Sequence, residues 1–221
     1  MMNNAINRHR MDNSPLRVPV AISAAHVYLT PAVIEQLFCD RYRLHEHSRL
    51  AQPTQYAAKE CVTLIGPKGR ISNVRVIGPP RSVNQIEVSM TDAHTLGIDA
   101  PVRRSGDLEG TPGVLIEGPR MRVALERGVI CGQPHVHMSP RDAERLGLKD
   151  QDRIEVATER HTRQILFRDV LVRVSSDCRL ELHLDRDEGA SAGLHSGDCV
   201  ILNKVSAPRS RTPSRIAARV L

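Results

Sequence analysis

The 221-residue chain is poor in aromatic residues and has no long hydrophobic run. Phe, Tyr and Trp make up 2% of it, and Trp is absent, which argues against the aromatic platforms that stack single-stranded nucleic acid. The longest apolar run is four residues, Cys199 to Leu202, whereas a helix needs about 20 apolar residues to cross a bilayer. We therefore expect no transmembrane segment, no signal peptide and no membrane partner.

Cysteine is also sparse, with five residues scattered along the chain and no Cys-x-x-Cys pair. An odd number of separated cysteines does not suit a disulfide framework. Reduced, buried thiols are typical of cytoplasmic proteins, and the cytoplasm is the location that we expect.

The formal net charge of +6 lies at the two ends of the chain. Residues 1–17 carry a net charge of +2 and residues 206–221 a net charge of +4, which leaves residues 18–205 formally neutral. A protein that binds a phosphate backbone needs a basic surface on its folded part. We therefore expect no nucleic-acid partner.

Gly and Pro interrupt the chain at short intervals, and the segments between them are short and either apolar or alternating. The stretch from Cys61 to Pro80 is an example, because two such segments flank Gly66-Pro67-Lys68-Gly69. This pattern predicts many short strands in a barrel or sandwich, and not a parallel sheet wrapped by long helices. The predicted fold class is mainly β.

The chain contains an internal repeat with an offset of 109 residues, about half its length. The segment His26–Pro31, HVYLTP, aligns without a gap on His135–Pro140, HVHMSP. Thr30 and Ser139 are predicted to cap short helices that begin with Pro, and glycines are predicted to end such helices. The repeat predicts two pseudo-symmetric β-barrel domains with short capping α-helices.

Histidines in the second copy of the repeat could form a metal site. His135 and His137 are two residues apart in an extended segment, so both side chains project to one face. His183 lies on the polar side of an alternating segment, opposite Leu182 and Leu184. Imidazoles suit Zn²⁺, and three of them would leave an open fourth position, as in catalytic zinc sites. The alternative is that these are solvated histidines, since short motifs often match by chance.

Further groups could contribute to such a site. Glu181 and Asp185 are either the solvated side of the same strand or groups that orient a histidine. Arg81 could bind an oxyanion or a phosphate and Glu87 could supply an oxygen ligand, although such a pair is more often an ordinary surface ion pair. The glycine-rich stretch 105–113 could approach a phosphate, but it lacks the spacing of a Walker loop.

At this point the chain resembles the phosphate propanoyltransferases of bacterial microcompartments, the phosphotransacylases of propanediol degradation. The resemblance runs from about Val18 to Val205, with its motifs in one order. It is carried by both histidine segments and by Gln52-Pro53, Gln55–Ala58, Val62–Gly69, Gly78-Pro79, Arg81-Ser82, Thr91–Ala93, Gly110–Gly113 and Leu180–Asp185. The resemblance implies the features of this family: two β-barrel domains capped by short helices, a two-zinc site between the domains, and assembly as a dimer.

We assign the domains on this basis. Residues 18–24 together with 133–205 are expected to form one β-barrel domain, and residues 25–132 a second, with a small insertion around 39–59. Residues 1–17 are expected to be a polar tail and residues 206–221 a basic tail. Within the latter, residues 214–221 have the apolar spacing of a short helix that could direct encapsulation, or they are a disordered basic tail.

The resemblance implies the residues of both metal sites. One site falls on His135, His137 and His183, which all match the family. The other keeps His26 and Glu87, but Tyr28 stands in place of the family's second histidine. Arg81 matches the arginine that meets the phosphate. Ser82, Gly110 and Thr111 are further implied substrate-binding residues, and Cys131 is interpreted as a buried thiol unless it replaces the missing ligand.

The resemblance also implies an activity, cofactors and partners. The expected enzyme is an acyltransferase that interconverts acyl-CoA plus phosphate with acyl phosphate plus CoA, for propanoyl or a similar short acyl chain. The expected cofactor is Zn²⁺, with one ion bound tightly and a second more weakly, and coenzyme A is a substrate. Zn²⁺ would favour the CoA thiolate, and Arg81 with zinc would hold the phosphate. The implied assembly is a homodimer, with shell or cargo proteins of a microcompartment as further partners.

The chain departs from the family around these residues. Ala25 and Pro134 replace the arginines that precede the two histidine segments, and Met90 stands where the family usually has arginine. Together with Tyr28, these departures keep open an alternative function, a metal-binding microcompartment-associated homologue with impaired catalysis.

Overall fold

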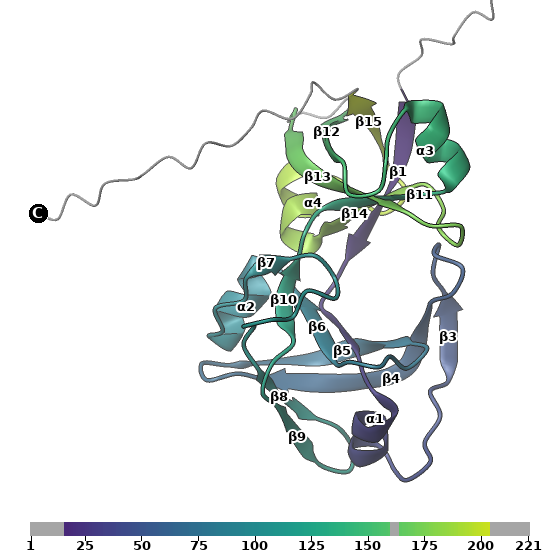
Figure 1. The fold of residues 1–221 in the computed structure, drawn as a ribbon. Helices are drawn as coiled ribbons and strands as arrows, with labels where there is room; N and C mark the ends of the chain where they lie inside the picture. Colours follow the sequence, from purple (N-terminus) through teal and green to yellow (C-terminus); the bar gives the residue numbers. More distant parts are fainter. Residues whose placement is uncertain (1–15, 160–163, 204–221) are drawn as a thin grey trace, which may run out of the picture.

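The computed structural model describes residues 16–159 and 164–203, which form two β-rich domains (Figure 1). Most of the expected N-terminal tail and all of the expected C-terminal tail, with its predicted helix at 214–221, lie outside the described residues. Leu16 and Arg17, which the sequence analysis assigned to the tail, belong to the first strand. The predicted mainly β class is confirmed.

The first domain is a closed barrel in which every strand pairs with two neighbours. Its interior holds the alternate residues of each strand, such as Leu182 and Leu184, which are nearly inaccessible to solvent. This is the face that the alternating sequence predicted. In ring order the strands are β1 (Leu16–Ser23), β14 (Glu181–Asp185), β11 (His135–Met138), β13 (Leu166–Val174), β12 (Arg153–Thr158) and β15 (Cys199–Asn203).

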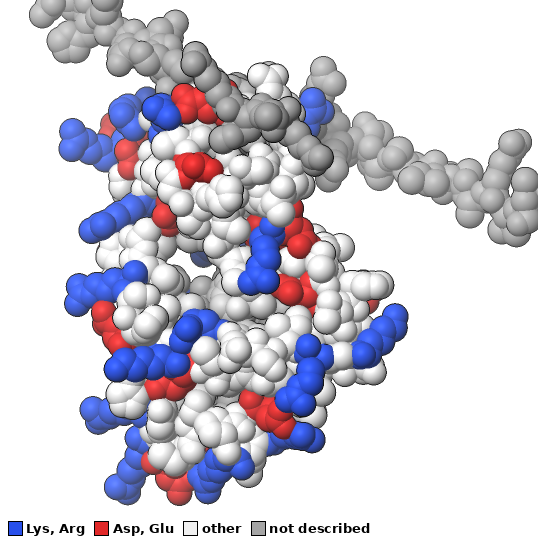
Figure 2. All heavy atoms as spheres, turned by 180° about the vertical axis from the view of Figure 1, so that it is seen from behind, with Lys and Arg blue, Asp and Glu red and all other residues white. Residues whose placement is uncertain are grey.

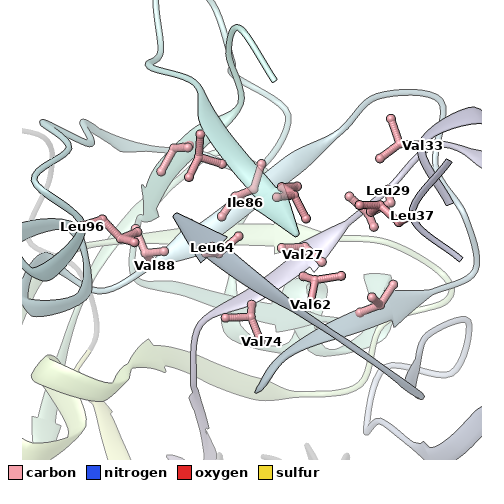
Figure 3. Close-up of a cluster of buried hydrophobic side chains, with 14 of the residues drawn as sticks. Val27, Leu29, Val33, Leu37, Val62, Leu64, Val74, Ile86, Val88 and Leu96 are labelled. Atoms are coloured by element: carbon pink, nitrogen blue, oxygen red, sulfur yellow. The ribbon is translucent and has the colours of Figure 1, made fainter. Parts of the chain in front are cut away.

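The second domain is a half-barrel, a curved sheet whose described strands do not pair into a closed ring. Val27, Leu64, Val74 and Ile86 lie in its core, among side chains from several strands (Figure 3). In spatial order the strands are β7 (Val102–Arg103), β10 (Val129–Gly132), β6 (Gln85–Val88), β2 (His26–Tyr28), β5 (Arg70–Gly78), β4 (Tyr56–Ile65), β8 (Val114–Glu117) and β9 (Arg122–Leu125), with β3 (Glu46–Arg49) paired to β4.

Short helices follow strands in both domains, as the repeat predicted. Thr30 and Ser139 accept backbone hydrogen bonds as N-caps, and Pro is the first residue of both helices. Gly97 and Gly147 end two of the helices in the left-handed conformation, where glycine carries no side-chain penalty. The helices are α1 (Pro31–Leu37), α2 (Met90–Leu96), α3 (Pro140–Leu146) and α4 (Arg186–Ala192). None of the helices in the described part of the chain has the length and apolar character that crossing a membrane requires.

The two domains repeat one arrangement of strands around the histidine segments. β2 pairs with β5 in parallel and with β6 in antiparallel fashion, and β11 pairs in the same way with β13 and β14. In the first arrangement His26 lies opposite Glu87, and in the second His135 lies opposite His183. The repeat in the sequence therefore corresponds to a repeat in the fold, and it places equivalent side chains in both domains.

The chain crosses between the domains at β1 and again after β10 (Figure 1). β1 lies in the barrel, between β14 and β15, although the chain that follows it builds the other domain. Polar contacts also connect the domains: the amide of Thr91 at the start of α2 donates to Asp187 of α4 at 2.8 Å. On the face that Figure 2 shows, the surface is hollowed between the domains, and acidic and basic side chains are interspersed over both.

Candidate active site at the domain interface

A cavity of about 580 Å³ lies between the two domains. The second domain contributes side chains from β2, β5 and β6, and the barrel contributes side chains from β11, β13 and β14. We call this cavity the cleft. All predicted metal-ligating residues and the predicted phosphate-binding arginine line it: His26, Tyr28, Arg81, Glu87, His135, His137 and His183.

Three histidines of the barrel meet in the cleft. His135 and His137 project from one face of β11, and His183 lies opposite His135 on β14. One potential ligand atom from each of the three lies within 4.8 Å of the others, and the Nε2 atoms of His135 and His137 are 3.2 Å apart. Among the residues described, this is the only group of three or more histidine, cysteine or acidic side chains that is close enough to share a metal ion.

Each of these imidazoles has a second contact that fixes its ring. His135 Nδ1 lies 2.8 Å from the carbonyl oxygen of Gln133, and His137 Nδ1 lies 3.2 Å from Cys178 Sγ. His183 Nε2 lies 2.8 Å from a carboxylate oxygen of Glu181, so Glu181 orients a histidine, one of the two possibilities that the sequence left open. Metal-binding histidines commonly hold such a partner on their other nitrogen.

The environment favours the neutral form of the histidines on β11. Burial lowers the pKa of His137 to about 3, with the charges of His183 and Arg173 acting in the same direction. Burial also holds the pKa of His135 well below its usual value, with further lowering by His183 and His137. Neutral imidazole is the form that binds a metal. Three nitrogen donors at this spacing fit a borderline ion such as Zn²⁺.

The equivalent position of the second domain offers fewer donors. His26 Nε2 lies 3.5 Å from a carboxylate oxygen of Glu87, and Nδ1 lies 2.9 Å from the carbonyl oxygen of Ala24. Burial, together with the charge of Glu87, raises the pKa of Tyr28 far above its usual value. Tyr28 therefore keeps its proton in the absence of a metal, and its hydroxyl donates to Gln55 at 3.3 Å. His26 and Glu87 are the two donors that remain.

Two arginines bring positive charge into the cleft. The guanidinium carbon of Arg81 lies 3.3 Å from the centre of the Tyr28 ring, which is a cation–π contact. Arg173 projects from β13 into the cleft. Within the described part of the chain, neither guanidinium is within ion-pairing distance of a carboxylate. Uncompensated guanidinium groups in a cleft favour the binding of phosphate groups.

Glutamine side chains hold the polar groups of the cleft in place. Gln85 is almost fully buried, and its Nε2 donates to Glu87 at 2.5 Å and to Ser105 at 2.8 Å. Its carbonyl oxygen accepts from the amide of Gly106 at 2.8 Å. Gln52 reaches across to the barrel, where its Nε2 lies 3.3 Å from the carboxylate of Glu181.

Two lining residues of the cleft, Arg173 and Gln85, were not predicted, because each belongs to a segment whose local pattern is that of an ordinary strand. Ser105, from the glycine-rich stretch 105–113, also lines the cleft. Ser82, Gly110 and Thr111 are not among the lining residues. Thr111 is buried and bonds Leu108 and Gly128, so its role is to hold its own loop. The substrate-binding role of these three residues stays a prediction.

The possible replacement ligand and the positions that depart from the family pattern differ in whether they line the cleft. Cys131 is buried, as predicted, and burial raises the pKa of its thiol to about 11. Its sulfur lies 3.3 Å from that of Met90 and it does not line the cleft, so it does not replace a ligand at Tyr28. Ala25 lines the cleft, whereas Pro134 does not.

Comparison with known proteins gives one consistent result. The family model of phosphate propanoyltransferase matches residues 19–195. A phosphate propanoyltransferase of Thermotoga maritima is 50% identical over 183 residues, which cover 83% of this chain and 87% of that protein. One of Salmonella typhimurium is 48% identical over 176 residues, 80% of this chain and 83% of that protein. A third, of Citrobacter koseri, is 46% identical over 181 residues, 82% of this chain and 86% of that protein.

Proposed function

Because the chain belongs to the phosphate propanoyltransferase family, a family of acyltransferases, we propose that its cleft transfers a short acyl group between coenzyme A and phosphate. The observation that carries the proposal is the meeting of three histidines, close enough to share a metal ion, with two arginines that form no ion pair within the described residues, in one cavity. A metal ion held by the histidines could bind a thiol or a carbonyl oxygen, and the arginines could bind phosphate.

The reaction conserves atoms and charge. In one direction the thioester C–S bond of acyl-CoA breaks, and a C–O bond forms between the acyl carbon and an oxygen of HPO₄²⁻. The phosphate gives up its proton and the departing CoA sulfur takes it up, so the products are acyl phosphate and the free thiol. The reverse direction uses the same groups.

His135, His137 and His183 are the residues that would hold Zn²⁺. When bound, this ion would lower the pKa of the CoA thiol and polarise the thioester carbonyl. The residues of the chain supply the rest of the chemistry. Glu181 holds the ring of His183, and Gln133 and Cys178 hold the other two rings.

Arg81 and Arg173 would bind the phosphate and stabilise the charge that develops during transfer. Arg81 is held against the face of Tyr28, so the ring keeps the guanidinium in the cleft without neutralising it. Glu87 and Glu181 supply the negative side of the cleft, but they contact His26 and His183. The arginines therefore remain available to an anion.

One observation favours the alternative function, a metal-binding homologue with impaired catalysis. Tyr28 stands where the equivalent β11 position has His137, and its raised pKa opposes binding as a phenolate. A second Zn²⁺ would then have only His26 and Glu87 as ligands.

We propose that the chain binds one zinc ion tightly and a second one weakly. We further propose that it forms a homodimer and that this homodimer resides in a bacterial microcompartment of the cytoplasm.

The direct test is an acyl-transfer assay. Purified protein is given propanoyl-CoA, with acetyl-CoA in a parallel series, and thiol release is followed with and without phosphate. We expect phosphate-dependent release that a chelator abolishes and added zinc restores. Zinc bound to the histidines without any turnover would contradict the enzyme proposal and favour the alternative.

A further inference from the structure

A second cavity, of about 340 Å³, adjoins the cleft. Arg104 and Ser105 line it from the second domain, and Asp150, Gln151 and Ser175 are among the residues that line it from the barrel. It is therefore also an interface cavity. No local pattern in the sequence predicts this cavity, because its walls come from loops, turns and strand ends that lie far apart in the chain.

The two cavities meet at the reacting centre of the proposed enzyme. Ser105, His137 and Arg173 line both of them. His137 separates the two: its Nε2 contacts His135, which lines only the cleft, and its Nδ1 contacts Cys178, which lines only the second cavity. A small ligand in the second cavity thus reaches the shared residues without passing the outer part of the cleft.

The second cavity carries an excess of positive charge. Arg104 donates to the amide oxygen of Gln151 at 2.8 Å, which fixes the guanidinium across the domain interface without neutralising it. The Arg173 guanidinium has no hydrogen-bond partner among the described residues. Backbone hydrogen bonding lowers the pKa of Asp150, and the charges of Arg173 and Arg104 help to lower it. Asp150 is the only carboxylate in the lining, and its oxygens accept from the amide of Val174 and from Gln151 Nε2, both at 2.9 Å. Two cations thus face one carboxylate that is already satisfied.

We propose that this second cavity is the path by which inorganic phosphate enters and acyl phosphate leaves, while CoA occupies the larger cleft, and that Arg104 attracts the phosphate group into it. The inference rests on the proposed function. A compact dianion fits a small cationic cavity, whereas an adenine nucleotide with its pantetheine arm needs the larger one. With separate paths, both substrates can be bound at once, and they meet at Arg173 and His137.

The test compares two neighbouring arginines. In Arg104→Ala, the KM for phosphate should rise about tenfold, as expected for the loss of one charge-assisted hydrogen bond, and the KM for propanoyl-CoA should stay within about twofold. The matched control is Arg103→Ala, because Arg103 lies 3.9 Å from Asp107 and lines neither cavity. The control should leave both KM values within about twofold of the parent chain.

A second variant tests the proposed phosphate path by narrowing the second cavity and leaving its charge unchanged. Ser175 is exposed and lines only the second cavity, so Ser175→Phe should narrow the cavity and raise the KM for phosphate alone. The inference is overturned if Arg104→Ala behaves like Arg103→Ala, or if either variant changes the KM for propanoyl-CoA instead. An inactive parent chain would refute the proposed function. In that case the ³¹P line width of inorganic phosphate, compared between the parent chain and Arg104→Ala, still decides whether Arg104 binds phosphate.

Discussion

Tyr28 and His137 occupy equivalent positions in the two halves of the molecule, and their difference sets the character of the cleft. His137 is a neutral donor beside two further histidines. Tyr28 is a protonated phenol that supports Arg81 with its ring and bonds Gln55 with its hydroxyl. The same backbone thus presents a potential metal ligand in one domain and a support for an arginine in the other.

We predict that Tyr28→His changes the zinc content. The parent chain should retain about one zinc per chain after dialysis, because three histidine nitrogens bind more tightly than His26 with Glu87. Tyr28→His supplies a third donor and should raise the content towards two, measured by elemental analysis. Tyr28→Phe is the matched control, since it keeps the ring under Arg81 and should leave the zinc content unchanged. Two equally tight ions in the parent chain would refute the prediction.

Arg81 should act on phosphate and not on CoA. We predict that Arg81→Ala lowers kcat/KM for phosphate by at least about tenfold, because a charge-assisted contact is lost. Arg70→Ala serves as the control, because Arg70 is exposed and pairs with Glu117 outside the cleft. Steady-state kinetics with each substrate varied in turn make the comparison. A change confined to the CoA dependence would show that Arg81 has a different role.

The site residues that could be predicted from the sequence are those that belong to a repeated or alternating pattern. His26 and His135 repeat at the fixed offset, His137 stands two residues after His135 in the same segment, and His183 lies on the polar side of a clear alternation. Arg173 stands in β13 among residues of similar pattern, and only the closed barrel shows that its side chain reaches the cleft. Ser82, Gly110 and Thr111 were predicted from matched motifs and do not line the cleft, and the hydroxyl of Thr111 bonds within its own loop.

Among the single elements, the boundaries of many strands and helices can be predicted from local sequence signals. A short strand that carries the histidines runs into an N-cap and a proline, and this order fixes where β2 and β11 end. His26 and His135 are the first residues of these two strands, and both line the cleft. Whether a sheet closes into a ring depends instead on pairing between distant strands, so the sequence did not distinguish the closed barrel from the open sheet.

The insertion predicted around residues 39–59 is held by a buried carboxylate. Glu60 of β4 accepts hydrogen bonds from Tyr42 at 3.0 Å and from the amide of His45 at 3.1 Å, and it lies 2.8 Å from His45 Nδ1. Burial alone would raise the pKa of Glu60, but these hydrogen bonds outweigh it and hold the pKa below its usual value. The ionised form of Glu60 thus secures the segment that carries Gln52 and Gln55 into the cleft.

This contact predicts a dependence of stability on pH. A carboxyl group with a lowered folded-state pKa contributes stability above its unfolded pKa and loses the contribution as the pH falls through its folded pKa. At pH 7, Glu60→Gln should lower the free energy of unfolding by about 1–3 kcal/mol. The difference from the parent chain should shrink below about pH 4.5, measured by urea unfolding. Glu46→Gln, which alters an exposed carboxylate, is the control. A difference that does not change with pH would contradict the prediction.

At the scale of the whole molecule, the cleft exists because two domains are held against each other by polar contacts. Gln52 is the most buried of these links: its carbonyl oxygen accepts from the amide of Arg179, and its amide approaches Glu181. Glu181 in turn holds His183. Gln52 is separated by 127 positions from Arg179 and by 129 from Glu181, and no local sequence pattern predicts contacts over such distances in the chain. The connection from Gln52 through Glu181 to His183 is therefore visible only in the fold.

We predict that Gln52→Ala weakens both the interface and the metal site. Loss of a buried hydrogen-bonding group should lower the free energy of unfolding by about 1–2 kcal/mol. Loss of support for Glu181 should lower zinc affinity by about tenfold, the lower end of the range for residues that orient a metal ligand. Competition with a zinc chelator measures the affinity. Gln36→Ala, on the exposed face of α1, should change neither quantity, and an equal effect of the two variants would count against the role of Gln52.

We propose that the three histidines of the barrel form the metal centre on which acyl transfer depends. The deciding experiment measures zinc content and the rate of propanoyl transfer from CoA to phosphate in the same preparations of His137→Ala and His195→Ala. His195 is exposed beside Asp198 and lies outside the cleft. His137→Ala should lose its tight zinc and at least about 100-fold of the rate, while His195→Ala keeps both. A His137→Ala variant that transfers acyl groups at the parental rate would contradict the account.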